Sequence, residues 1–173
     1  MAVPGRYTRL LVMNTTLATG EVGEGFRQWR EYARTQPDLA VGRLLRRGKR
    51  DMSEAEAAAY DAPFPDRRYR AGVRRFPALV PVTPDMEGVD TSLKSTQFFR
   101  ERWNGKTFMA IGMQDPVLGP PVMRALSKTI RGCPEPLELP EAGHFVQEHG
   151  QVVAERALAA FGDTGDTAGP SAH

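Results

Sequence analysis

Three segments of the chain carry runs of hydrophobic residues, the pattern of strands buried on both faces of a parallel sheet. Residues 9–17 begin Arg-Leu-Leu-Val-Met, residues 107–112 read Thr-Phe-Met-Ala-Ile-Gly, and residues 137–139 read Leu-Glu-Leu. Helical spacing follows the second and third segments, over residues 119–131 and 146–161. This strand–helix–strand–helix order with short links predicts an α/β protein with a parallel sheet.

Between the first two strands the pattern predicts only helices. Residues 25–35, 68–80 and 92–103 have helical spacing. Ser53-Glu54-Ala55-Glu56 is a capping box, which predicts a short helix ending at Tyr60. A helical insertion of roughly half the chain therefore separates the first strand from the second.

Two helices are predicted to bury one hydrophobic face each. In residues 68–80, the side chains expected to face inward are Val73, Phe76 and Val80. In residues 146–161, those expected to share a face are Val152, Val153, Ala157, Leu158 and Phe161.

These elements predict a division of the chain into three parts. Residues 1–17 and 92–162 form the core, residues 18–91 form a helical cap, and residues 163–173 form a polar, disordered tail. The first strand begins within about ten residues of the N-terminus, so nothing upstream can pair with its outer edge. An unpaired strand edge promotes association, and we expect the chain to self-associate through it.

Composition narrows the classes of function. A chain of 173 residues with 25% charged and 40% hydrophobic residues suits one globular domain, and its net charge of +2 gives no overall attraction to nucleic acid. A single cysteine, Cys133, excludes a disulfide framework and a multi-cysteine zinc site. No signal peptide or membrane span is recognisable, so we expect a cytoplasmic protein without a membrane partner. The basic run over residues 43–50 is interpreted as a solvated loop or helix face, with nucleic-acid binding as the less favoured alternative.

Two side chains that can carry chemistry follow consecutive predicted strands. Asp115 comes just after the second strand and His144 just after the third, where parallel sheets place their sites. Each has a structural alternative, as a turn aspartate and as a loop histidine bonded to a carbonyl. Taken together, an acid followed by a histidine is the order found at the end of an α/β-hydrolase triad.

The nucleophile of such a triad is not recognisable in the chain. It is expected before the acid, on a strand-to-helix turn of the form Gly-x-nucleophile-x-Gly. The glycines four apart are Gly165 and Gly169, which follow the histidine with no strand before them. Among the aromatic residues, Trp29 offers an indole N–H that can bind an anion, or packs with Phe26 on a helix face.

Several stretches together resemble the C-terminal part of haloalkane dehalogenases, the subgroup whose catalytic acid follows the same strand as Asp115. The most specific are Trp-Asn-Gly-Lys-Thr-Phe-Met-Ala-Ile-Gly-Met-Gln-Asp, which ends at Asp115, and Ala-Gly-His-Phe-Val-Gln-Glu, which contains His144. The other matching stretches are residues 9–14, 25–29, 54–56, 60–66, 71–77 and 132–137. The resemblance covers the cap and the last three strands. It implies a partial α/β-hydrolase fold with an inserted helical cap.

The resemblance implies a role for each candidate residue. An aspartate nucleophile would form an alkyl-enzyme ester, His144 would activate the water that hydrolyses it, and Asp115 would orient His144. Trp29 would donate its N–H to the departing halide. The substrate pocket would be shaped by Phe26, Phe76, Pro77, Val117 and Leu118. The resemblance implies a haloalkane and a halide ion as ligands, and no metal or organic cofactor.

The resemblance also places the nucleophile, and a second halide-binding tryptophan, in a half that would precede Met1. Since Met1 falls where the family has an internal residue, we expect a truncated or mis-started reading frame, and a chain that is inactive alone. Two alternatives remain. One is an epoxide hydrolase of the same fold, whose cap tyrosines would be among Tyr32, Tyr60 and Tyr69. The other is a non-catalytic fragment or binding chain.

Overall fold

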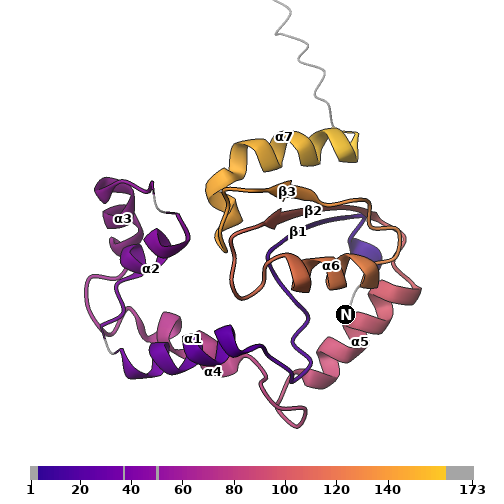
Figure 1. The fold of residues 1–173 in the computed structure, drawn as a ribbon. Coiled ribbons are helices and arrows are strands. Elements are labelled where there is room, and N and C mark those ends of the chain that lie inside the picture. Colours follow the sequence, from indigo (N-terminus) through magenta and orange to yellow (C-terminus); the bar gives the residue numbers. More distant parts are fainter. Residues whose placement is uncertain (1–3, 37, 50, 163–173) are drawn as a thin grey trace, which may run out of the picture.

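A three-stranded parallel sheet forms the centre of the protein (Figure 1). The computed structural model describes residues 4–36, 38–49 and 51–162. After a short 3-10 turn, η1 (Pro4–Arg6), the strands are β1 (Arg9–Met13), β2 (Lys106–Gly112) and β3 (Leu137–Leu139), with β2 in the middle. All three predicted strands are confirmed, although the first ends at Met13 instead of continuing to residue 17.

Helices cover both faces of this sheet. On one face lie α5 (Val89–Glu101) and α6 (Pro120–Thr129), where Met109 and Ile111 of β2 join a buried cluster with α6 residues. On the other lie the 3-10 turn η2 (Val146–His149) and α7 (Gly150–Phe161), against Phe108 and Ala110. Because alternate residues of β2 are buried on opposite faces, the strand reads as a continuous hydrophobic run.

Trp103 completes the first of these clusters, at the end of α5. The side chain is buried, and its indole N–H donates to the Thr107 hydroxyl at 2.9 Å. Its ring meets those of Phe98 and Phe99 edge to face. A buried tryptophan with a satisfied N–H serves the core.

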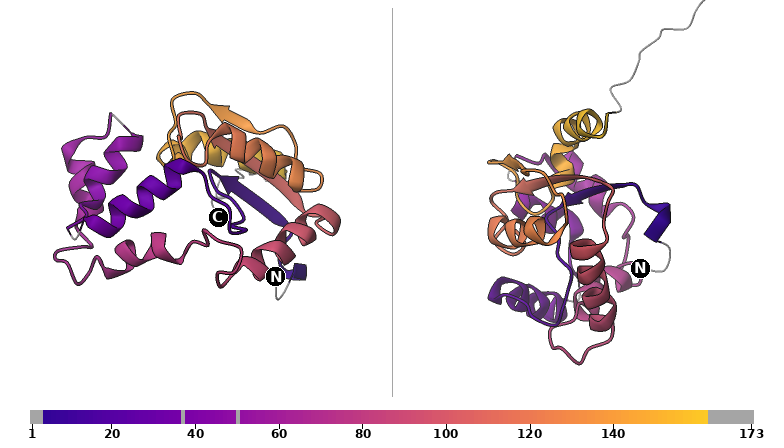
Figure 2. Two further views of the ribbon diagram at one scale, coloured as in Figure 1. Left: turned by 60° about the horizontal axis from the view of Figure 1, so that its bottom comes forward. Right: turned by 90° about the vertical axis from the view of Figure 1, so that its right-hand side faces the viewer.

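Helices α1 (Glu24–Thr35), α2 (Val41–Gly48), α3 (Glu54–Asp61) and α4 (Ala71–Leu79) stand to one side of the sheet (Figures 1 and 2). We call these helices and their links the cap. Helix α2 packs on α3, and α1 on α4. The cap has a hydrophobic cluster of its own, formed by Val41, Leu45, Met52 and Ala57.

Local sequence signals account for some cap helices better than for others. The predicted capping box is confirmed, since Ser53 Oγ accepts from the Glu56 N–H and the Glu56 carboxylate accepts from the Ser53 N–H. Helix α2, by contrast, appears in the sequence as a basic run. Its buried Val41 and Leu45 form one narrow hydrophobic stripe. The charge pattern fits a loop as well as a helix, and packing on α3 stabilises the helix.

The predicted hydrophobic faces of α4 and α7 were partly wrong. Phe76, expected to face inward, is 69% exposed, because among the described residues nothing covers its side of α4. In α7 the buried stripe consists of residues four apart, Val153 and Ala157 with the half-buried Phe161. Val152 and Leu158 lie on its flanks and are 38% and 49% exposed. The predicted tail, residues 163–173, lies outside the described residues. Within the described chain, no helix has the length and apolar character needed to cross a membrane.

Candidate functional site

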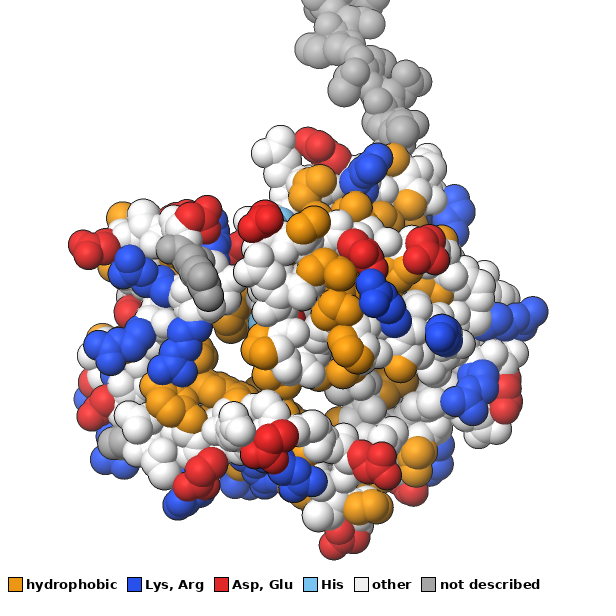
Figure 3. Space-filling view, in the orientation of Figure 1, with side chains coloured by type: hydrophobic (Ala, Val, Ile, Leu, Met, Phe, Trp, Pro, Cys, Tyr) orange, Lys and Arg blue, Asp and Glu red, His pale blue; other side chains and the backbone are white. Residues whose placement is uncertain are grey.

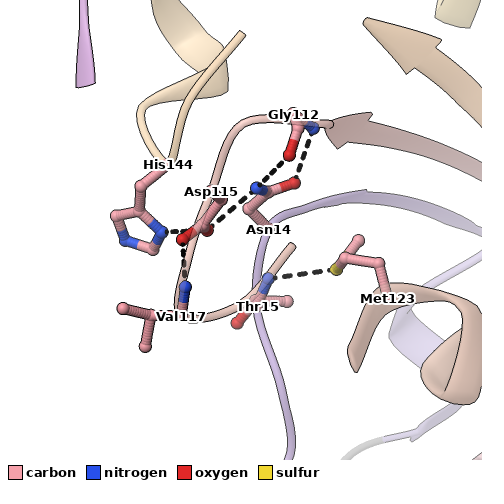
Figure 4. Close-up of polar contacts among 7 residues, drawn as sticks. All are labelled: Asn14, Thr15, Gly112, Asp115, Val117, Met123 and His144. Atoms are coloured by element: carbon pink, nitrogen blue, oxygen red, sulfur yellow. Dashed lines mark hydrogen bonds and ion pairs between the residues drawn. The ribbon is translucent and has the colours of Figure 1, made fainter. Parts of the chain in front are cut away.

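Asp115 and His144 meet at the carboxyl end of the sheet, each in the link that follows a strand (Figure 4). The Nδ1 atom of His144 lies 2.7 Å from the Oδ2 atom of Asp115. Parallel strands end at the same edge of the sheet, so residues 29 positions apart in sequence come within hydrogen-bond distance. The structure therefore joins the two residues that the sequence singled out.

The Asp115 carboxylate is enclosed, and three donors converge on it. Its side chain is fully buried. Oδ2 also accepts a hydrogen bond from the Asn14 side-chain amide at 2.9 Å, and Oδ1 accepts one from the Val117 N–H at 2.8 Å. Burial raises the pKa of the Asp115 carboxyl, but the hydrogen bonds from His144, Val117 and Asn14 outweigh burial and leave the pKa below its ordinary value. Asp115 is therefore a carboxylate at neutral pH.

This charge decides which nitrogen of His144 carries the proton. A carboxylate only accepts hydrogen bonds, so the neutral imidazole must place its N–H on Nδ1. The Nε2 atom, which points away from Asp115 in Figure 4, then has a free lone pair. The His144 side chain is 43% exposed, so this lone pair can reach a water molecule. The pair has the geometry of a general base with an orienting acid.

Asn14 is the site residue that the sequence analysis missed. It directly follows β1, and its side-chain amide bonds the Gly112 backbone in place of the next backbone hydrogen bonds between β1 and β2. Its Oδ1 atom accepts from the Gly112 N–H at 2.8 Å, and its Nδ2 atom donates to the Gly112 carbonyl at 3.1 Å and to Asp115. Asn14 thus ends β1 at Met13 and ties the Asp115 carboxylate to the sheet. In the sequence Asn14 is a polar residue at a strand end, which is an ordinary turn signal and does not distinguish it.

The lowered pKa predicts how acid affects stability. A carboxyl with a lowered folded-state pKa stabilises the fold above its unfolded pKa of about 3.9, and that stability is lost as pH falls through the folded-state pKa. Urea unfolding from pH 6 downwards should show the free energy of unfolding of the wild type falling toward that of Asp115→Asn. A difference between the two proteins that does not change with pH would contradict the assignment.

The predicted halide and pocket residues lie on the cap and on the link after β2. Phe26 and Trp29 are half-buried on α1, and the Trp29 indole N–H has no hydrogen-bond partner among the described residues. The start of α1 touches the Asp115 link, since a Cβ added at Gly25 would lie 3.3 Å from Val117 Cγ2. Val117 and Leu118 are half-buried in that link.

The remaining pocket candidates lie on α4, where Pro77 is buried and Phe76 is exposed. Helix α4 packs on α1, so these two residues share the cap layer with Trp29. The space-filling view shows the molecule hollowed between the cap and the sheet-bearing part, with hydrophobic side chains on the cap side of the hollow (Figure 3). Within the described ranges, no group of three metal-ligating side chains comes together.

Comparison with known proteins gives a consistent picture. No protein-family model matches the chain. A haloalkane dehalogenase of Mycobacterium marinum is 42% identical over 156 residues, which are 87% of this chain and 52% of the relative. A haloalkane dehalogenase of Psychrobacter cryohalolentis is 34% identical over 158 residues, 88% of this chain and 52% of the relative. The structure of the tetrameric haloalkane dehalogenase DpaA from Paraglaciecola agarilytica NO2 superposes with a TM-score of 0.87 at 44% identity, covering 90% of this chain and 53% of DpaA.

These comparisons confirm the predicted resemblance to the C-terminal part of haloalkane dehalogenases, and with it the partial α/β-hydrolase fold. The chain spans about half the length of the curated relatives that it matches.

Proposed function

We propose, from the homology to the C-terminal part of haloalkane dehalogenases, that this chain provides the acid–histidine pair and the cap of a haloalkane-hydrolysing enzyme. The observation that carries the proposal is the contact of 2.7 Å between His144 Nδ1 and the buried Asp115 carboxylate. In this function, residues 18–91 cover the substrate and the residues around the sheet hold the catalytic pair. The reaction consumes one haloalkane and one water, and releases an alcohol, a halide ion and a proton.

The chemistry divides between this chain and a partner half. A carboxylate nucleophile supplied by the other half displaces the halide and forms an ester with the alkyl group. His144 Nε2 then takes a proton from water, and the resulting hydroxide attacks the ester carbonyl. Cleavage releases the alcohol and restores the carboxylate, and the His144 imidazolium then gives its proton to solvent. Asp115 stabilises the imidazolium that forms on His144.

Trp29 has the properties of a hydrogen-bond donor to a halide ion. Its indole N–H has no partner within the described ranges, and an N–H in a partly apolar site stabilises the charge that develops on a departing halide. Phe26 precedes Trp29 by three positions on α1 and directly follows Gly25, which lies against Val117. We place Phe26 and Val117, with Leu118, Phe76 and Pro77, around the substrate.

A chimera tests the proposed function. It joins the N-terminal part of DpaA to residues 9–162 of this chain, at the start of the matched region, and we call it the reconstituted enzyme. We expect it to release halide and protons in equal amounts from short bromoalkanes, and the 173-residue chain alone to release neither. A folded chimera without halide release would contradict the proposal.

The epoxide-hydrolase alternative requires cap tyrosines that are free to activate an epoxide. Here the Tyr60 hydroxyl donates to Glu148, and the Tyr32 hydroxyl accepts from Arg47 at 3.3 Å. Tyr69 is 60% exposed. The bond to Glu148 counts against Tyr60 as an epoxide activator, whereas Tyr32 keeps its O–H free to donate. Turnover of a short epoxide by the reconstituted enzyme, without halide release from bromoalkanes, would decide for the alternative.

The exposed edge of β1 predicts self-association of the chain by itself. Leu11 is 44% exposed, and an apolar groove of about 330 Å³ runs along β1 toward Phe99 of α5. Light scattering after size exclusion should show a mass that rises with concentration, because unpaired strand edges bind one another. Leu11→Lys should return the chain to a monomer, whereas Leu93→Lys, at a residue 51% exposed on α5, should not. A wild-type monomer at all concentrations would contradict this prediction.

A further inference from the structure

The link that carries His144 lies between the core and the cap, and it touches both. On the core side, a Cβ added at Gly112 of β2 would lie 2.1 Å from the Gly143 carbonyl oxygen. On the cap side, a Cβ added at Gly143 would lie 2.5 Å from the carbonyl oxygen of Gly48, at the end of α2. Only glycine permits backbones this close, so the residue before His144 fits between β2 and α2 without space to spare.

The residue after His144 belongs to the hydrophobic cluster of the cap. Phe145 packs against the cluster that contains Val41, Leu45, Met52 and Ala57. Its ring also meets the His144 imidazole edge to face, with the ring centroids 5.1 Å apart. The imidazole is therefore held by Asp115 on the core side, and rests against a phenylalanine that is anchored in the cap.

A hydrogen bond also joins the cap to η2, the turn that follows His144 and Phe145. The Tyr60 hydroxyl, near the end of α3, donates to the Glu148 carboxylate in η2. Tyr60 is half-buried, and the bond to Glu148, together with burial, raises the pKa of its hydroxyl, so the donor stays protonated at neutral pH. Glu148 lies in η2, which begins directly after Phe145, so this hydrogen bond ties the segment that follows His144 to the cap.

We propose that these contacts form a clamp, made of Gly48, Tyr60, Phe145 and Glu148, through which cap helices α2 and α3 hold His144 against Asp115. The clamp residues touch neither substrate nor reacting atoms in the proposed mechanism. They are positioning residues for His144, and their effect reaches the reaction through the orientation and tautomer of the imidazole. The relevance to catalysis rests on the proposed function, whereas the clamp itself is a property of this chain.

The physical reason is that a single hydrogen bond does not fix an imidazole that is 43% exposed. The ring can rotate about its two side-chain torsions and exchange the Nδ1–H···Asp115 contact for water. The edge-to-face contact with Phe145 limits this rotation, and the Tyr60–Glu148 bond limits the movement of the backbone that carries both rings. Loosening the cap therefore shifts His144 toward the other tautomer.

Nitrogen NMR of the ¹⁵N-histidine-labelled 173-residue chain at pH 8 tests the clamp without any need for activity. The chain has three histidines, and His144→Gln identifies the signals of this one. We expect the Nδ1–H tautomer to predominate in the wild type. Tyr60→Phe should lower the ratio of Nδ1–H to Nε2–H by about threefold, within the range that one hydrogen bond supplies. Phe145→Ala should lower it by about tenfold, and Phe145→Leu, which refills the cluster, by less.

Tyr69→Phe is the matched control, since Tyr69 is exposed, and it should leave the ratio unchanged. Far-UV circular dichroism verifies that each variant is folded, and if Phe145→Ala unfolds, Tyr60→Phe still decides. Wild-type ratios in folded Tyr60→Phe, or no preference for Nδ1–H in the wild type, would overturn the clamp. In the reconstituted enzyme, Tyr60→Phe should lower kcat about threefold at constant KM. Failure of halide release there, with the tautomer shift intact, would contradict the proposed function alone.

Discussion

Replacing His144 by glutamine is expected to stop the reconstituted enzyme after a single release of halide. Formation of the ester needs the nucleophile and the groups that donate hydrogen bonds to the halide. Hydrolysis of the ester needs the Nε2 atom of His144 as a base. Halide should appear as a burst of one equivalent per site, and the steady-state rate should fall by about 10²–10⁴, the contribution typical of a general base. Intact-protein mass spectrometry should then show one alkyl group bound to the chimera.

His149→Gln is the matched control for this experiment. His149 lies five residues further on, at the end of η2, and takes no part in the Asp115 contact. It should release halide at the rate of the unmodified chimera. Continued turnover of His144→Gln, or loss of the burst together with the turnover, would show that His144 does not act on the ester.

The second large effect is expected from Asp115→Asn. An asparagine offers one acceptor oxygen where the three donors of His144, Asn14 and Val117 now find two. In either orientation its amide group faces at least one donor, so a buried polar group loses its partner. The free energy of unfolding should fall by about 1–3 kcal/mol. Where the NH₂ group of the asparagine faces His144, Nδ1 must accept its hydrogen bond. The imidazole proton then lies on Nε2, which can no longer act as a base.

The kinetic consequence should be a fall in kcat of about 10⁴, the loss measured when the acid of a serine-protease triad is changed to its amide. Asp90→Asn tests whether any change of aspartate has this effect, because the Asp90 side chain is 88% exposed on α5. It should leave both kcat and the unfolding free energy nearly unchanged. A kcat for Asp115→Asn within about tenfold of the wild type would mean that the contact is structural only.

Much of the sheet, and the pairing of Asp115 with His144, follows from local sequence. A strand buried on both faces must be hydrophobic throughout, so residues 107–111 identify β2 from their own sequence, before its neighbouring strands are known. A capping box satisfies its own backbone donors, so α3 begins where Ser53 predicts. Asp115 and His144 could be paired in advance because the carboxyl ends of neighbouring parallel strands share one edge.

Tertiary structure decided the features that depend on what packs against a residue. Phe76 and Val73 occupy one predicted face, yet Phe76 is exposed, because periodicity does not show where a neighbouring layer ends. Asn14 is an ordinary turn residue in sequence. Only the packing of Gly112 and Asp115 against it, about a hundred positions later in the chain, gives its amide three hydrogen bonds.

The division is clearest around His144. Its place after a strand, and the glycine before it, can be seen in the sequence. Which groups pack around it cannot, since Gly48 and Tyr60 lie far from His144 and Phe145 in the chain and reach their segment only through the packing of the cap on the core. Sequence thus determined which groups can do chemistry, because reactivity belongs to residue type and local position. Their orientation was decided by long-range packing, because it depends on contacts that no local pattern records.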